Sequence, residues 1–293
     1  MTTLPVATHH APSSRWRRVA RRLPWWIAAA FLLGAAALWV FPFVWMLSAS
    51  LKDNMEMFAG GLNLLPTDFV WSNYERAWYD AHFGTYLSNT VIVTLVTVLI
   101  VTIRCATCGY VLARYRFMGS KVFLAVLVAT LFVPTGYTII PVVKVSMQLG
   151  LIDSLTGMIL ALSGGGYVSA VLLYYGYFRR IPRELEEAAV VDGAGFVRTF
   201  VSVMLPLAMP VTATVAVLTF ITTWNSFFLP LVFSFSRPEL RTVSVGMQAF
   251  VGETATDWTG MAAAGVISIL PVVIVFVFLQ RYFVEGISGA VKS

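Results

Sequence analysis

Residues 187–206 read EAAVVDGAGFVRTFVSVMLP and form a polar stretch between two long apolar runs. The stretch opens on an acidic residue and two alanines, has a glycine at position 193, and ends on Leu205 and Pro206. Because both flanking runs are long and apolar, we expect the stretch to connect two membrane-embedded segments at the membrane surface.

The residues around this stretch predict two short helices. Pro182 suits a helix start, because its missing N–H would have no intrahelical partner there. Three glutamates follow in the first turns, where the helix dipole favours negative charge. Leu185 and the two alanines place an apolar stripe at helical spacing. Gly193 can end this helix, since glycine adopts the left-handed conformation without strain, and a second helix is predicted over 196–204.

The composition places most of the chain in a membrane. Of 293 residues, 58% are hydrophobic and only 12% are charged, with a mean hydropathy of +0.80. A soluble domain cannot bury this much apolar surface, and a helical span needs about 20 mostly apolar residues. We therefore predict an all-α membrane protein with six transmembrane helices at roughly Trp25–Ser48, Leu87–Ala113, Val122–Val143, Gly157–Phe178, Leu205–Phe233 and Gly260–Tyr282.

The basic residues predict the orientation. Most of the 20 lysines and arginines fall in the N-terminal tail, in residues 114–121, in residues 179–198 and near the C-terminus. The positive-inside rule then places these segments, both termini included, in the cytoplasm. The +6 net charge is read as this topological signal, and no nucleic-acid partner is expected.

Two other features have simple explanations. The basic tail and first apolar run could form a cleaved signal peptide, but the run is longer than a usual signal core, so an uncleaved span is favoured. Cys105 and Cys108 form a C-x-x-C in the second span without a nearby histidine. Packing is therefore favoured there over metal or redox chemistry, and no metal site is expected.

The spacing from Glu187 to Pro206 resembles the cytoplasmic EAA loop of ABC-importer permeases, the membrane subunits onto which an ATPase docks. The resemblance implies a type I ABC-importer permease architecture and a coupling role for this loop. The residues to which it assigns ATPase coupling are Glu187, Ala188, Ala189, Asp192, Gly193, Leu205 and Pro206.

Weaker matches extend over residues 25–293 and resemble the carbohydrate permeases of the maltose-permease kind. They include Asn73-Tyr74, Asn89 and Trp224-Asn225. The C-terminal residues resemble a tail that reaches the ATPases, although the tail is one residue shorter than usual. The residues of this implied contact are Gly289, Ala290, Val291 and Lys292.

The resulting organisation is a cytoplasmic tail over residues 1–24, a permease domain over residues 25–282 and a cytoplasmic C-terminal tail over residues 283–293. The EAA coupling loop occupies residues 179–204 of the permease domain. The three glycines at 164–166 should bend the fourth span, and 243–250 should form a short interfacial helix.

Substrate-pathway candidates lie in the fifth and second spans. Thr222, Thr223, Trp224 and Asn225 belong to the densest polar cluster within any predicted span, although for each residue hydrogen bonds to the helix backbone or between helices are slightly favoured. Arg104 is a charge inside the second span. It either lines the pathway or bonds backbone carbonyls, because an unpaired charge there is costly.

We therefore expect a non-catalytic permease subunit of an ATP-driven importer for a carbohydrate or similar polyol, in the bacterial inner membrane. The expected partners are a homologous second permease, two ATPase subunits, an extracytoplasmic solute-binding protein and the lipid bilayer. The sequence has no G-x-x-x-x-G-K-[ST] loop, so ATP and Mg²⁺ are assigned to the ATPases and no cofactor to this chain. The alternatives are an ion-coupled secondary transporter, which would favour carboxylates within spans, and an intramembrane enzyme, which would need a buried catalytic constellation.

Overall fold

The computed structural model describes residues 14–59, 63–165, 167–252 and 255–290. The regular structure of these residues is helical, apart from one isolated bridge between Val251 and Thr256. The predicted all-α fold class is therefore confirmed.

Three helices are each long and apolar enough to cross a membrane: α1 (Ser14–Ala49), α4 (Phe83–Arg114) and α15 (Trp258–Ala290). They contain the predicted first, second and sixth spans. α1 begins well before residue 25, so the helix includes part of the predicted tail. Arginine and alanine are good helix formers, and they allow the apolar helix to extend in this direction.

α4 is the central element of the fold. Its 32 residues extend over about 48 Å at 1.5 Å per residue. It packs chiefly on α8 (Val168–Arg180) and α12 (Met209–Trp224), and α12 in turn packs on α15. Three buried apolar clusters follow α4, around Phe83 at one end, Val93 in the middle and Tyr110 at the other end.

Two further spans are bent helix pairs. α7 (Leu155–Gly164) and α8 meet at 57°, which agrees with the predicted bend at the glycines. The segment Phe196–Leu207 and α12 meet at 80°. With each pair counted as one span, the described residues contain up to five candidate spans.

The predicted third span is wrong as a single helix. The chain forms α5 (Ser120–Thr130), a 3₁₀ turn (Thr135–Thr138) and α6 (Ile139–Gln148) instead. Pro134 accounts for the break, because proline lacks an N–H donor and restricts the residue before it. The predicted fifth span is also divided. α12 ends at Trp224, and α13 (Phe228–Phe233) is a separate short helix.

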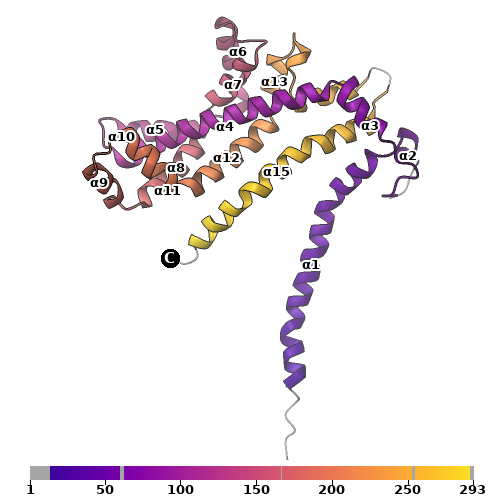
Figure 1. Cartoon of the computed structure of the whole chain (residues 1–293), viewed down its shortest axis with the longest axis horizontal. Helices are drawn as coiled ribbons and strands as arrows, with labels where there is room; N and C mark the ends of the chain where they lie inside the picture. The colour runs from indigo at the N-terminus through magenta and orange to yellow at the C-terminus, as the bar shows by residue number, and fades with distance from the viewer. Residues whose placement is uncertain (1–13, 60–62, 166, 253–254, 291–293) are drawn as a thin grey trace, which may run out of the picture.

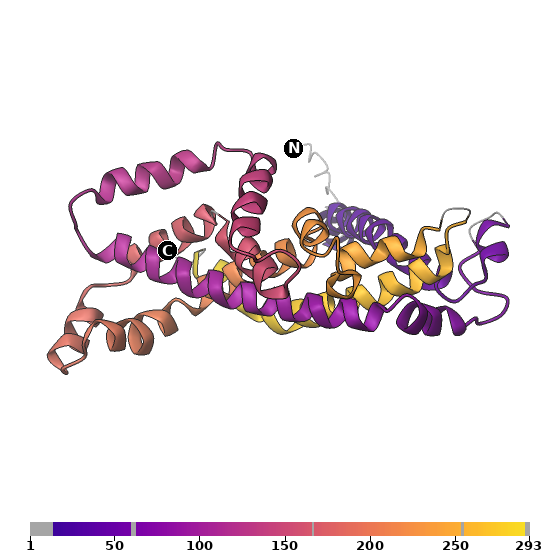
Figure 2. The same ribbon diagram turned by 90° about the horizontal axis from the view of Figure 1, so that it is seen from above.

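The remaining helices are short and gather towards the two ends of α4 (Figures 1 and 2). One end carries α9 (Glu184–Val191), α10 (Phe196–Thr199), a π-helical turn (Phe200–Met204) and α11 (Leu205–Leu207). The other end carries α2 (Asn54–Phe58), α3 (Ser72–Glu75), a π-helical turn (Arg76–Asp80), a 3₁₀ turn (Pro238–Leu240), α14 (Val243–Gly246) and a second 3₁₀ turn (Met247–Phe250). The last two form the short helix predicted at 243–250.

α1 diverges from the other helices (Figure 1). It meets α15 near one end, and none of its most apolar window, within Ile27–Ala49, is buried inside this chain. Large apolar side chains such as Phe31, Leu38 and Trp39 are therefore exposed.

Candidate functional site

α9 forms as the local sequence predicts. Pro182 lies two residues before its start, and the helix begins at Glu184. Gly193 follows the helix with φ +81°, the left-handed conformation expected of a glycine that ends a helix. The Ala194 N–H then donates to the Ala189 carbonyl oxygen at 2.9 Å, which satisfies one carbonyl of the last turn.

The predicted coupling residues do not share one face. Glu187, Ala188, Asp192 and Gly193 are exposed, whereas Ala189 is only 9% exposed and packs inside the chain. The exposed residues can reach a partner in the conformation seen here, while Ala189 holds the helix against its own domain.

Apolar side chains extend the exposed surface of α9. Val190, Val191 and Val197 are 62%, 87% and 70% exposed, beside the polar residues of the same loop. Exposed apolar patches rimmed by polar residues mark interaction sites. Sequence reasoning missed these valines, because their spacing alone does not distinguish an exposed face from a buried one.

Glu186 points the other way and joins α9 to α4. The Tyr110 hydroxyl donates to Glu186 Oε1. Arg114 Nε lies 3.1 Å from Glu186 Oε2 as an ion pair, and an Arg114 terminal nitrogen donates to the Ile181 carbonyl oxygen at 2.7 Å. The side chains of Arg114 and Glu186 are only 5% and 16% exposed. Sequence reasoning treated Glu186 as a helix-start carboxylate and missed this contact.

Aromatic rings pack the same end of α4. The Tyr110 ring lies 5.4 Å from that of Phe178, 5.7 Å from Phe196 and 5.1 Å from Phe200, measured between centroids. Tyr115 stands edge-on to Tyr110 at 5.9 Å. Such pairs add to the burial of apolar area, so the loop after α9 is anchored on α4 and α8.

Leu205 and Pro206 lie where the loop turns into the fifth span. They form α11, which follows the π-helical turn and precedes the 80° bend. Met204 and Ala208, on either side, are fully buried. The chain therefore bends just after this pair, at Ala208, and not at the predicted pair itself.

The candidates in the fifth span mostly bond their own helix. Thr222 Oγ1 and Asn225 Nδ2 each donate to the carbonyl four residues earlier at 2.8 Å. Trp224 is buried and stacks on Phe220 with ring centroids 5.2 Å apart. Thr222 and Asn225 are exposed within this chain, and Thr223 is buried. Of this set, Thr222 and Asn225 present polar surface beyond the helix.

Arg104 bonds a backbone carbonyl. One terminal nitrogen donates to the Gly165 carbonyl oxygen at 2.9 Å, and the guanidinium lies 5.8 Å from the centre of the Tyr167 ring. It therefore spans the break between α7 and α8. Cys105 and Cys108 are free thiols, and no group of three metal-binding side chains occurs in the part of the chain described.

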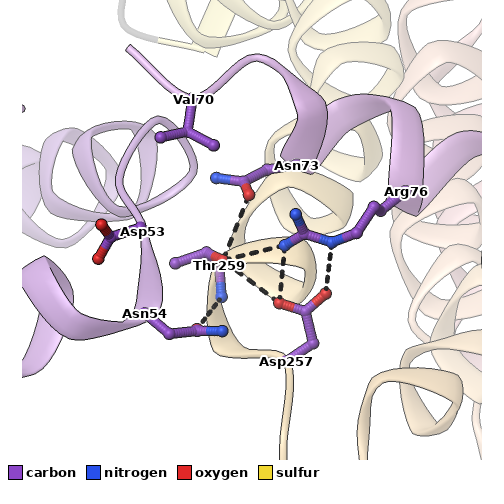
Figure 3. A pocket seen from close by; sticks show the side chains of 7 residues that line it. All are labelled: Asp53, Asn54, Val70, Asn73, Arg76, Asp257 and Thr259. Carbon is purple, nitrogen blue, oxygen red and sulfur yellow. Dashed lines mark hydrogen bonds and ion pairs between the residues drawn. The ribbon is translucent and has the colours of Figure 1, made fainter. Parts of the chain in front are cut away.

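A second polar site lies at the opposite end of α4, in and around a cavity of about 230 Å³ (Figure 3). Arg76 donates to both Asp257 oxygens at 3.1 and 3.2 Å and to Thr259. Thr259 also bonds Asn73 and Asn54. Burial acts to raise the pKa of Asp257, but hydrogen bonds from Arg76, Gly260 and Thr259 hold it below its ordinary value. We call this set the Arg76–Asp257 cluster; its members lie too far apart in sequence for local patterns to join them.

The C-terminal candidates are only partly described. Gly289 and Ala290 lie at the end of α15. Val291 and Lys292 lie outside the described residues.

Comparisons with known proteins agree with the sequence pattern. The family described as "binding-protein-dependent transport system inner membrane component" matches residues 105–289. A diacetylchitobiose uptake system permease of Streptomyces coelicolor is 32% identical, covering 89% of this chain and 87% of the relative. A melibiose/raffinose/stachyose import permease of Bacillus subtilis is also 32% identical, covering 86% and 91%.

A solved structure has the same fold. It is a chain of a bacterial ABC transporter involved in the import of the acidic polysaccharide alginate, with a TM-score of 0.78 and 28% identity. The match covers 96% of this chain and 100% of that chain. The bent spans, the α9 loop and these relatives together establish that this chain belongs to the family of binding-protein-dependent transport system inner membrane components, the permease subunits of ABC importers.

Proposed function

We propose that this chain imports a carbohydrate or similar polyol, as one permease subunit of an ATP-driven transporter in a bacterial inner membrane. The family membership supports the importer role. The substrate class rests on the relatives, whose names include diacetylchitobiose and melibiose, and on the alginate importer that shares the fold.

The working complex would contain a second, homologous permease, two ATPase subunits and an extracytoplasmic binding protein. ATP and Mg²⁺ would bind the ATPases. The exposed valines around α9 support an assembly larger than this chain.

The α9 end of the molecule would face the cytoplasm, with both termini on the same side. The support is the charge pattern, since residues 114–121 and 179–198 are rich in lysine and arginine and lie at this end. The Arg76–Asp257 cluster would then face the binding protein's side of the membrane.

The exposed face of α9 is the observation on which the docking proposal rests. Glu187, Ala188 and Asp192, with Val190 and Val191, form a small acidic and apolar surface on a helix anchored to α4 and α8. A short helix of this kind can lie in a groove of a partner, where alanine permits close approach. The Glu187 carboxylate would pair with a basic group or an N–H donor at the edge of the groove.

Closure of the ATPases on ATP would draw the two α9 helices of the permease pair together. The motion would pass into the fifth span through α10 and α11, and the 80° bend before α12 gives that span a place to pivot. Closing the inner ends while the outer ends separate is the alternating-access scheme.

The family match supports an ABC importer and not an ion-coupled transporter. The candidate spans α1 (from Ile27), α4, α7, α8, α12 and α15 (to Phe278) contain no aspartate or glutamate. Coupling to protons or sodium usually uses such carboxylates at the bilayer centre.

Co-purification tests the docking proposal. The tagged chain, expressed with its partner permease and ATPase, should retain the ATPase, and Glu187→Lys should release it. Asp68→Lys makes the same charge change at an exposed position in the segment between α1 and α4, at the other end of the molecule, so it should leave the complex intact. Release by both variants, or by neither, would contradict the assignment.

Ligand binding to the partner binding protein tests the substrate class. The protein encoded beside this chain should be stabilised in a thermal-shift assay by a member of a carbohydrate panel that includes diacetylchitobiose and raffinose. Stabilisation by an amino acid or a metal ion alone would overturn the proposed substrate class but leave the importer role.

A further inference from the structure

Two consecutive glutamates of α9 face different surroundings. Glu187 is exposed on the surface proposed to meet the ATPase, while Glu186 is turned into the domain. Neighbouring residues of an α-helix lie about 100° apart, so consecutive side chains can serve different partners.

Glu186 contacts a single face of α4. Its two carboxylate oxygens engage Tyr110 and Arg114, which are four residues apart and therefore lie one helical turn from each other. Arg114 also donates to the Ile181 carbonyl in the connection that leads into α9. α4 thus contacts both α9 and the residues that lead into it.

The contact is well shielded from water. Tyr110 is fully buried, and the side chains of Arg114 and Glu186 are 5% and 16% exposed. Ionic contacts in such surroundings are strong and expensive to break singly, because the remaining partner is left buried and unpaired. A displacement of α9 would therefore carry the end of α4 with it.

The same tyrosine also contacts the segment after α9. Its ring packs on Phe196 and Phe200, while its hydroxyl bonds Glu186. Tyr110 therefore contacts the coupling loop both within α9 and after it. Because α4 runs the length of the molecule and carries clusters at both ends, it is suited to pass a movement to the outer end.

The geometry points to Glu186, Tyr110 and Arg114 as the joint through which α9 moves α4, with Glu186 as a positioning residue that does not touch the ATPase. This inference rests on the proposed function. It divides the glutamate pair: Glu187 holds the ATPase, and Glu186 transmits its motion.

Glu186→Gln and Glu187→Gln are matched variants with which to test this division. Each would be purified with the partner permease and ATPase in lipid nanodiscs. Three quantities would be measured: bound ATPase, basal ATP hydrolysis, and stimulation of hydrolysis by the binding protein encoded beside this chain. Stimulation requires a signal to pass from the outer end to the ATPase, whereas bound ATPase reports docking alone.

Glu186→Gln should keep bound ATPase and basal hydrolysis within about twofold and lower stimulation about tenfold, within the usual range of coupling between sites. Glu187→Gln should instead lower bound ATPase. Parallel loss of bound ATPase in both variants, or full stimulation in Glu186→Gln, would overturn the joint. If the unaltered chain bound no ATPase, the proposed function would fail first, and the joint with it.

Tyr110→Phe keeps the ring packing and removes only the hydroxyl, so it tests the contact with little risk that the protein fails to fold. It should lower stimulation in the same direction as Glu186→Gln. Added to Glu186→Ala, which removes the acceptor of the Tyr110 hydroxyl altogether, Tyr110→Phe should lower stimulation no further, because both changes then break the same contact. Additive losses would assign the two side chains to separate roles and contradict the joint.

Discussion

Asn73 is predicted to hold together residues 50–82, the segment between α1 and α4. It is 1% exposed, and its Nδ2 donates to the Ser50 carbonyl at 2.9 Å and to the Lys52 carbonyl at 2.7 Å. Its Oδ1 accepts from the Thr259 hydroxyl at 3.4 Å (Figure 3). One amide side chain therefore joins the end of α1, the start of α3 and the start of α15.

Asn73→Asp tests this role without changing the volume of the side chain. The carboxylate cannot donate, so two buried carbonyls lose their partner at about 1–3 kcal/mol each. The new charge also faces those carbonyl oxygens, so the total should be at least about 3 kcal/mol. At roughly 2–4 °C per kcal/mol, the midpoint of thermal unfolding should fall by roughly 6–12 °C.

The assay is the loss of the monodisperse peak in size-exclusion chromatography after heating in detergent. Asn54→Asp is the matched control in the same cavity, because Asn54 is exposed and its Oδ1 only accepts, from the Thr259 N–H at 3.4 Å. A carboxylate can accept equally well, so this variant should shift the midpoint by less than about 2 °C. Equal shifts in the two variants, or no shift in Asn73→Asp, would refute the reasoning.

Three further predictions concern other parts of the molecule. Gly109→Ala would place a Cβ 2.5 Å from Tyr174 Cβ, so α4 and α8 must separate at a cost of about 1–3 kcal/mol, whereas Gly176→Ala meets nothing within 4 Å and should be tolerated in the same thermal assay. Because the pKa of Asp257 is depressed in the folded state, its stabilisation is complete above an ordinary aspartate pKa of about 3.9 and is lost as the pH falls through the folded value. In Asp257→Asn, thermal stability should therefore fall less steeply below about pH 4. The same fall in the variant as in the unaltered chain would contradict a stabilising ion pair between Arg76 and Asp257. The Arg104 contact with the Gly165 carbonyl predicts that Arg104→Ala, at normal expression, retains most binding-protein-dependent transport. Loss of transport would instead indicate that Arg104 lines the substrate pathway.

The local features of the fold could be predicted where one residue decides the backbone. Gly193 ends α9 with the expected positive φ, and the glycines near 165 divide the fourth span. The long apolar runs that nothing interrupts became α1, α4 and α15, because an apolar run of this length favours a spanning helix. The breaks at Pro134 and after Trp224 were missed because hydropathy continues across them while backbone hydrogen bonding does not.

The candidate site was predicted only in part, because side-chain direction depends on contacts far away in sequence. The acidic and alanine pattern located α9, but not that Ala189 and Glu186 face inward. Asn89, noted only as a weak family match, donates to the Glu239 and Arg241 carbonyls at 2.8 and 3.0 Å and ties α4 to the 3₁₀ turn at Pro238–Leu240. No periodicity in the sequence indicates such a contact.

The most direct test of the account is the side of the membrane on which α9 lies. A cysteine would be introduced at the exposed Ala188 in a chain whose Cys105 and Cys108 are replaced by alanine, with Asp68→Cys as the outer control. A membrane-impermeant maleimide should label the Asp68→Cys chain in intact cells with the outer membrane opened, and the Ala188→Cys chain only after the inner membrane is broken. Labelling of the Ala188→Cys chain from outside would place the coupling helix where no ATPase can reach it and would contradict the account.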